Sequence, residues 1–227
     1  MIQYSKPLAD CQPGLWQQVV ARSRDWLHGL MPPACYLCLD PGQAPALDLC
    51  RGCEDDLPRN TQQPLLLDVA FAPYRYEFPL VELVHRLKYG NQPALARVLG
   101  TLLGRRLRER GRPRVDAIVP VPLHAAREAR RGYNQAGEIA AFVARELGLP
   151  VHDRLARRVR DTAEQAALPA IARRANVSGA FEVQGLPPLA VAIVDDVLTT
   201  GATVEALGKA LRRAGCRRIE VWAVAKA

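Results

Sequence analysis

Long apolar runs are missing from this sequence. Nowhere do about eighteen apolar residues follow one another, which is the length that a transmembrane helix requires. The N-terminus also lacks a basic segment leading into a continuous apolar stretch, the pattern of a secretory signal. We therefore expect a soluble protein that acts in the cytoplasm.

Aromatic residues are scarce as well, at 6% of the chain, whereas alanine, leucine and arginine are abundant. This composition favours helices and buried parallel strands over an all-β sandwich. The glycine patterns of Rossmann and Walker nucleotide sites are also absent. With 49% hydrophobic residues in 227, the chain can bury one substantial core and carry a small appendage. An α/β architecture is the prediction.

Basic residues outnumber acidic ones, 31 to 23, which gives a formal net charge of +8. A surface of this sign attracts polyanions in general. Phosphate-rich small molecules and nucleic acid are therefore both candidate partners.

Composition divides the chain into three regions. Residues 1–30 include an amphipathic helix over 14–30, and residues 31–64 are rich in Pro, Cys, Asp and Gly with little periodicity. Residues 65–227 alternate strand and helix patterns, which predicts a parallel, doubly wound sheet. The expected strands are 69–76, 115–121, 189–194 and 219–224, and the expected helices are 80–89, 94–110, 135–147 and 202–214. The arginine-rich segment 157–176 is predicted to be an excursion, that is, a segment that leaves the core and is not one of its strands or helices.

Four of the six cysteines form two close pairs, Cys35-x2-Cys38 and Cys50-x2-Cys53. Paired thiolates at this spacing converge on one tetrahedral metal site. A single pair is also compatible with a redox dithiol, but two matched pairs in a segment without its own core favour structural zinc. Cys11 and Cys216 stand apart from these pairs and are most simply a thiol in the N-terminal tail and a packed residue near the last strand.

The most informative motif joins an apolar strand to a polar turn that begins a helix. It runs Val194-Asp195-Asp196-Val197-Leu198-Thr199-Thr200-Gly201-Ala202-Thr203. Main-chain N–H groups at a helix start bind phosphate, and threonine hydroxyls add donors. Adjacent carboxylates accept hydrogen bonds from neighbouring sugar hydroxyls or help to hold a divalent cation. Helix capping explains one such polar residue but not the whole set, so the motif predicts a site for a phosphorylated sugar.

A second motif is a basic, glycine-containing loop after the strand 115–121. It holds His124, Arg127, Arg131 and Gly132 at the strand end where open α/β sheets bind ligands. Its positive charge suits pyrophosphate. Arg127 alone would be taken as a solvated surface residue, and for His124 a structural role and a substrate contact are equally consistent with the sequence.

The turn after Asp196 resembles the loop of type I phosphoribosyltransferases that binds 5-phosphoribosyl pyrophosphate (PRPP). The string from Val119 to Gln135, the element Leu87-Lys88-Tyr89 and the segment from Arg157 resemble the ComF family, also described as GntX-like. The resemblance implies a type I phosphoribosyltransferase-like sheet behind a small zinc-ribbon-like module.

The resemblance also implies roles for individual residues. Asp195 and Asp196 would be the catalytic pair that grips the ribose, and Thr199, Thr200, Gly201, Ala202 and Thr203 would bind the 5-phosphate. The residues expected to face the pyrophosphate, with Mg²⁺, are Lys88, Arg127 and Arg131. Arg157, Arg158, Thr162 and Gln165 would belong to a loop that closes over PRPP and contacts it.

Three functions remain open from the sequence. One is Mg²⁺-dependent phosphoribosyl transfer, whose acceptor base no residue identifies. Another, which the ComF resemblance implies, is the handling of single-stranded DNA together with the uptake machinery in natural competence. The third is a regulator that senses PRPP without catalysis. The oligomeric state is not predictable from this sequence.

Overall fold

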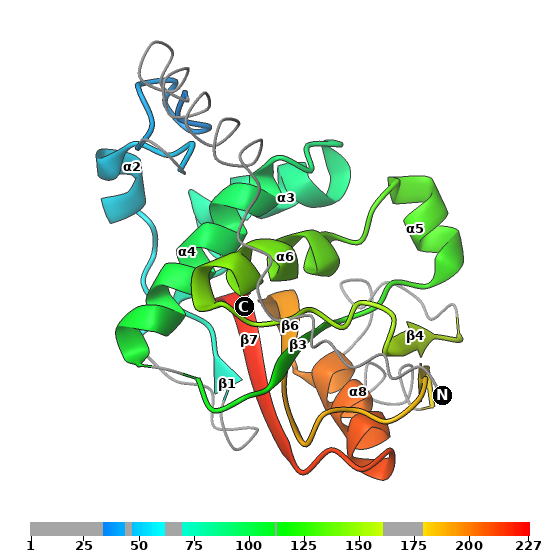
Figure 1. Cartoon of the computed structure of the whole chain (residues 1–227). Coiled ribbons are helices and arrows are strands. Elements are labelled where there is room, and N and C mark those ends of the chain that lie inside the picture. The colour runs from blue at the N-terminus through cyan, green and yellow to red at the C-terminus, as the bar shows by residue number, and fades with distance from the viewer. Residues whose placement is uncertain (1–33, 44–46, 62–69, 112, 161–178) are drawn as a thin grey trace, which may run out of the picture. The chain divides into compact units, whose positions relative to one another are not determined.

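The structure, a computed structural model, describes residues 34–43, 47–61, 70–111, 113–160 and 179–227 (Figure 1). The helix expected within residues 1–30 lies outside these ranges. The chain divides into two compact units, Met1–Cys53 and Glu54–Ala227. In the described ranges, no helix has both the length and the apolar character needed to cross a bilayer.

A parallel sheet forms the centre of the second unit. Its strand order is β1 (Ala70–Phe71), β7 (Arg218–Lys226), β6 (Ala190–Leu198) and β3 (Ala117–Pro120), and β2 (Tyr74–Arg75) also pairs with β7. All of these pairings are parallel. The apolar runs predicted as strands are buried, as expected for a parallel sheet covered on both faces. The predicted α/β fold class is confirmed.

Helices cover both faces of this sheet. Figure 1 shows α4 (Leu95–Arg110) and α6 (Gln135–Leu147) on one side and α8 (Ala202–Arg213) on the other. A Cβ on Gly100 of α4 would lie 2.7 Å from the Ile139 carbonyl oxygen of α6, so glycine is needed for the close approach of these helices. The helix α3 (Leu80–Tyr89) packs on α4, and Lys88 in its last turn contacts Asp196 near the carboxyl end of β6.

Two expectations about the site's surroundings were wrong. The basic segment after β3 is not a loop, because it forms the helix α5 (Ala125–Arg131). Alanine, arginine and glutamate favour helix, the His124 side chain caps its start, and Gly132, with a φ of 84°, ends it. The strand β6 also does not stop at Val194 but continues through both aspartates, because β7 offers ladder partners as far as Lys226.

Shorter elements also differ from the expectations. Within the predicted strand 69–76, the described residues from Ala70 onward form two short strands, β1 and β2, instead of one. The start of the predicted excursion is a strand, β4 (Ala156–Arg158), which pairs antiparallel with β5 (Phe181–Val183). This pairing joins residues distant in sequence, which local periodicity does not reveal. In the first unit, α2 (Arg51–Asp55) begins directly after Cys50.

Candidate functional site

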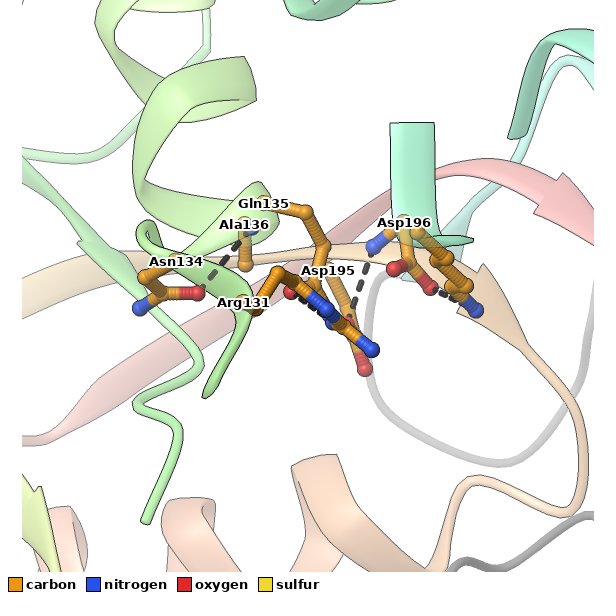
Figure 2. Close-up of polar contacts among 7 residues, drawn as sticks. Arg131, Asn134, Gln135, Ala136, Asp195 and Asp196 are labelled. Atoms are coloured by element: carbon orange, nitrogen blue, oxygen red, sulfur yellow. Dashed lines mark hydrogen bonds and ion pairs between the residues drawn. The ribbon is translucent and has the colours of Figure 1, made fainter. Parts of the chain in front are cut away.

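An acidic pair lies near the carboxyl end of β6, at the edge where the other parallel strands also end. Asp196, labelled in Figure 2, is 3% exposed. Its Oδ1 lies 2.8 Å from the Nζ of Lys88, which comes from the last turn of α3. The second oxygen of Asp196, Oδ2, is buried and has no hydrogen-bond partner in the described structure. Asp195 is half-buried, and its Oδ1 accepts a hydrogen bond from the Asp196 N–H at 2.9 Å. The pair therefore retains acceptors for a ligand.

Burial and the neighbouring carboxylate change the acidity of Asp195. Burial, followed by the negative charge of Asp196, raises the pKa of Asp195 to about 7, although Lys88 and Arg158 oppose the shift. Burial alone would lower the pKa of Lys88, but the charge and hydrogen bond of Asp196 outweigh it and raise the pKa. Lys88 therefore stays charged, and Asp195 holds its proton almost to neutral pH.

The raised pKa of Asp195 predicts that stability falls as the pH approaches 7. Its carboxyl group titrates near 3.8 when unperturbed and near 7 in the fold, so the folded state binds more protons between these values. This group therefore lowers the free energy of unfolding as the pH rises through that window. Urea denaturation at pH 5 and pH 8 should show a larger loss of stability in the wild type than in Asp195→Asn. Equal losses in the two proteins would contradict the shift.

The predicted phosphate loop follows directly after β6. Gly201 is the N-cap of α8 and has a φ of 77°, a left-handed conformation that favours glycine. Because the N-cap is a glycine, no N-cap side chain occupies the start of α8. The Thr200 hydroxyl accepts a hydrogen bond from the Ala202 N–H at 3.4 Å, and Thr203 lies in the first turn of the helix. The local sequence thus forms the strand, turn and helix start that the motif predicts.

A basic hollow of about 640 Å³ lies beside Lys88. Arg127, Arg130 and Arg131 of α5 line it together with Lys88 and Tyr89, and no carboxylate is among its lining residues. The guanidinium of Arg131 lies 5.6 Å from the centre of the Tyr89 ring. The three residues predicted to face the pyrophosphate, Lys88, Arg127 and Arg131, therefore lie around one cavity.

The residues after Gly132 hold this arrangement together. The Tyr133 hydroxyl donates to the Leu87 carbonyl, which ties the start of α6 to the last turn of α3. Asn134 caps α6 by accepting from the Ala136 N–H at 3.1 Å and donates to the Val121 carbonyl at 3.1 Å. Arg131 donates to the Gln135 side chain (Figure 2). The sequence motif included these residues but did not reveal their partners, although an Asn before a helical pattern is a recognisable N-cap signal.

The residues predicted for the loop over PRPP do not line the basic hollow. Arg157 forms an ion pair with Glu182 across the β4–β5 hairpin at 2.7 Å. Arg157 and Arg158 line a separate cavity of about 1180 Å³ beside β3, not the basic hollow. Arg158 is still near enough to Asp195 to affect its pKa. Thr162 and Gln165 lie outside the described residues.

His124 and Cys216 have structural contacts. The Nδ1 of His124 accepts a hydrogen bond from the Ala126 N–H at 3.4 Å at the start of α5. Cys216 is buried before β7, and its thiol donates to the carbonyl groups of Leu189 and Arg218. Cys11 lies outside the described residues.

The four paired cysteines converge in the first unit. The sulfur atoms of Cys35, Cys38, Cys50 and Cys53 all lie within 4.8 Å of one another, close enough to bind one zinc ion. Burial raises the pKa of Cys35, but N–H groups of Cys50, Cys38 and Leu37 lower it overall to about 6. Burial and the neighbouring sulfurs raise the pKa of Cys53. The cluster thus already stabilises one thiolate, the form that binds metal.

Comparison with known proteins identifies the family. Residues 86–227 match the phosphoribosyl transferase domain family. Competence protein F of Haemophilus influenzae is 39% identical over 160 residues, which cover 67% of this chain and 70% of that protein. The chain belongs to the competence protein F (ComF) family. The resemblance inferred from the sequence motifs is confirmed.

Two further proteins show how far this ComF-family chain resembles others. The DNA utilization protein YhgH of Salmonella typhi is 38% identical over 159 residues, covering 66% of this chain and 69% of that protein. The structure of a purine phosphoribosyltransferase from Pyrococcus horikoshii is 17% identical in sequence. The matched region covers 67% of this chain and 73% of that chain, with a TM-score of 0.32. The last similarity is too low to bear on the site.

Proposed function

We propose that this ComF-family protein binds PRPP with Mg²⁺ at the carboxyl edge of its parallel sheet. The observation that carries the proposal is the position of the acidic pair between two regions suited to anions. The turn Thr199–Thr203 begins a helix on one side, and the basic hollow around Lys88 lies on the other. PRPP is a ribose with a phosphate at one end and a pyrophosphate at the other. Its two anionic ends match the helix start and the basic hollow, and its ribose matches the acidic pair between them.

The acidic pair suits the ribose and a cation. Asp195 and Asp196 would accept hydrogen bonds from the two neighbouring ring hydroxyls. The buried Oδ2 of Asp196, which has no partner in the described structure, requires a donor or a cation. Mg²⁺ favours carboxylate and phosphate oxygens, so it fits beside this pair, where it would offset charge on the pyrophosphate. Lys88, Arg127 and Arg131 would face the pyrophosphate group.

The same arrangement supports phosphoribosyl transfer. A nitrogen nucleophile would form a bond to the anomeric carbon as the bond to the pyrophosphate oxygen breaks, and the electron pair would leave with pyrophosphate. The protein would hold ribose and phosphates in line and place cations around the charge that develops on the leaving group. Arg158, from the β4–β5 hairpin, would approach the ribose from the side of Asp195.

Pyrophosphate release tests the transfer activity. The purified protein, supplied with Mg-PRPP and a panel of purine and pyrimidine bases, is expected to release pyrophosphate with one of them. Release above the hydrolytic background would support a transferase. Tight Mg-PRPP binding without release for any base would instead favour a PRPP-sensing regulator.

A second candidate function is the handling of single-stranded DNA in the cytoplasm. The names of the relatives, competence protein F and DNA utilization protein, support a link to DNA uptake or use. The net charge of +8, three arginines on α5 and the exposed Tyr89 ring would suit phosphates and a stacked base. Salt-sensitive binding of single strands that persists in the variant Asp195→Asn with Asp196→Asn would support DNA binding that does not depend on the ribose site.

We also propose that the cysteine cluster binds one structural zinc ion. Tetrahedral Zn–S bonds of about 2.3 Å place sulfur atoms about 3.7 Å apart. The Sγ atoms of Cys38 and Cys50 are 3.5 Å apart, and the Cys53 N–H donates to the Cys50 sulfur, as in a turn that presents two thiolates to a metal. These distances fit zinc without a large rearrangement.

A further inference from the structure

The lysine that ends β7 is held against the turn that leads into α8. Lys226 is the ladder partner of Leu198, so it lies beside the point where the chain leaves β6. Its Nζ donates to the main-chain carbonyl of Thr199 at 2.6 Å. Thr199 is the first residue of the proposed phosphate loop, whereas Lys226 lies outside the motif that predicted this loop.

The partner of this ammonium differs from those of two other lysines. Lys88 and Lys209 each lie 2.8 Å from a carboxylate oxygen, of Asp196 and Glu205 respectively. Lys226 instead donates to a neutral carbonyl. An ammonium has three N–H donors, so two remain for other acceptors. Among the described residues no carboxylate binds this ammonium, so its positive charge lies next to the phosphate loop without a bound carboxylate to offset it.

The same hydrogen bond also fixes a main-chain donor. In a planar trans peptide the C=O and N–H groups point in opposite directions. Because the Thr199 carbonyl is directed at Lys226, the N–H of Thr200 is directed to the opposite side of that peptide. The next peptides are constrained as well, by the hydrogen bond between Thr200 and Ala202 and by the left-handed Gly201. Lys226 thus sets the orientation of the first peptide in the loop.

We propose that Lys226 is a positioning residue that gives the Thr199–Thr203 loop much of its affinity for a phosphate monoester. It holds the first loop peptide in a fixed orientation and adds a positive charge next to the site. This inference rests on the proposed function, which places the 5-phosphate of PRPP on this loop. It predicts that a residue on a neighbouring strand, outside the recognised motif, determines how strongly the phosphate end of the ligand binds.

Calorimetry on the full chain tests this role with ribose 5-phosphate and Mg-pyrophosphate as probes. Lys226→Met is expected to bind ribose 5-phosphate about tenfold more weakly than the wild type and to bind pyrophosphate within about twofold of it. Lys226→Arg keeps a cationic donor and is expected to retain most of the affinity. Lys209→Met, which removes the same charge from the exposed side of α8, is the matched control and should leave both affinities unchanged.

The outcomes separate this inference from the proposed function. If Lys226→Met binds ribose 5-phosphate as tightly as the wild type, or loses affinity equally for both probes, the positioning role is overturned and PRPP binding still stands. A wild type that binds Mg-PRPP but no ribose 5-phosphate would overturn the positioning role alone, and one that binds neither would overturn both. Melting temperatures of the variants, measured alongside, establish that the comparison is made on folded protein.

Discussion

Replacing both members of the acidic pair, Asp195→Asn together with Asp196→Asn, is expected to weaken Mg-PRPP binding at least about 100-fold. The variant loses the two carboxylates that would accept hydrogen bonds from the ribose hydroxyls and lie beside Mg²⁺. A hydrogen bond to a charged group contributes about 1.5–3 kcal/mol, and each 1.4 kcal/mol is about tenfold in affinity. Isothermal titration calorimetry measures this directly.

The chain offers a matched control for this experiment. Asp55 and Asp56 form a second consecutive pair, and both are exposed. Asp55→Asn with Asp56→Asn makes the same change in net charge and should leave Mg-PRPP affinity within about twofold of the wild type. If the two double variants bind Mg-PRPP equally well, the assignment of the ribose site to Asp195 and Asp196 is wrong.

Replacing one cysteine of the cluster is expected to abolish zinc binding and to unfold the part of the first unit that holds the zinc. Cys50→Ser should reduce bound zinc from about one ion per chain to almost none. In zinc-finger peptides the apparent free energy of zinc binding is about 10–16 kcal/mol at pH 7, and it drives folding. A segment with little apolar content should therefore lose its structure without the ion. Metal analysis and the rate of proteolytic cleavage within residues 34–53 measure the two effects.

Cys216→Ala is the control for this change. Cys216 is a buried cysteine outside the cluster, so its replacement should leave the zinc content at one ion per chain. The cluster is not a zinc site if the wild type is purified without zinc and does not bind added zinc. The same conclusion follows if the Cys50→Ser variant keeps one zinc ion per chain.

Local patterns were sufficient for most of the framework. The helices α3 and α6 have the predicted bounds, because each has a clear apolar face and a polar or glycine residue at its end. The strands β6 and β7 were recognised as apolar runs, since strands buried on both faces need apolar residues throughout. The turn from Thr199 to Ala202 was also predictable, because strand, turn residues and helix start are contiguous in the sequence.

Contacts between distant segments were not predictable in the same way. Lys88 was expected near pyrophosphate, but nothing in the sequence shows that its ammonium reaches Asp196. The Lys226 hydrogen bond depends on the register of two neighbouring strands. The hairpin of β4 with β5 was missed for the same reason, and α5 was missed because its charge and the following glycine resemble those of a loop. Tertiary pairing decides these features, and a single sequence carries little information about it.

The most direct test of the account is a crystal structure of the protein with Mg-PRPP. We expect the ribose hydroxyls within hydrogen-bond distance of Asp195 and Asp196, the 5-phosphate on the turn Thr199–Thr203, and the pyrophosphate in the hollow lined by Lys88, Arg127 and Arg131. Density for the ligand at another place, with the carboxyl edge of β6 free of it, would contradict the proposed function.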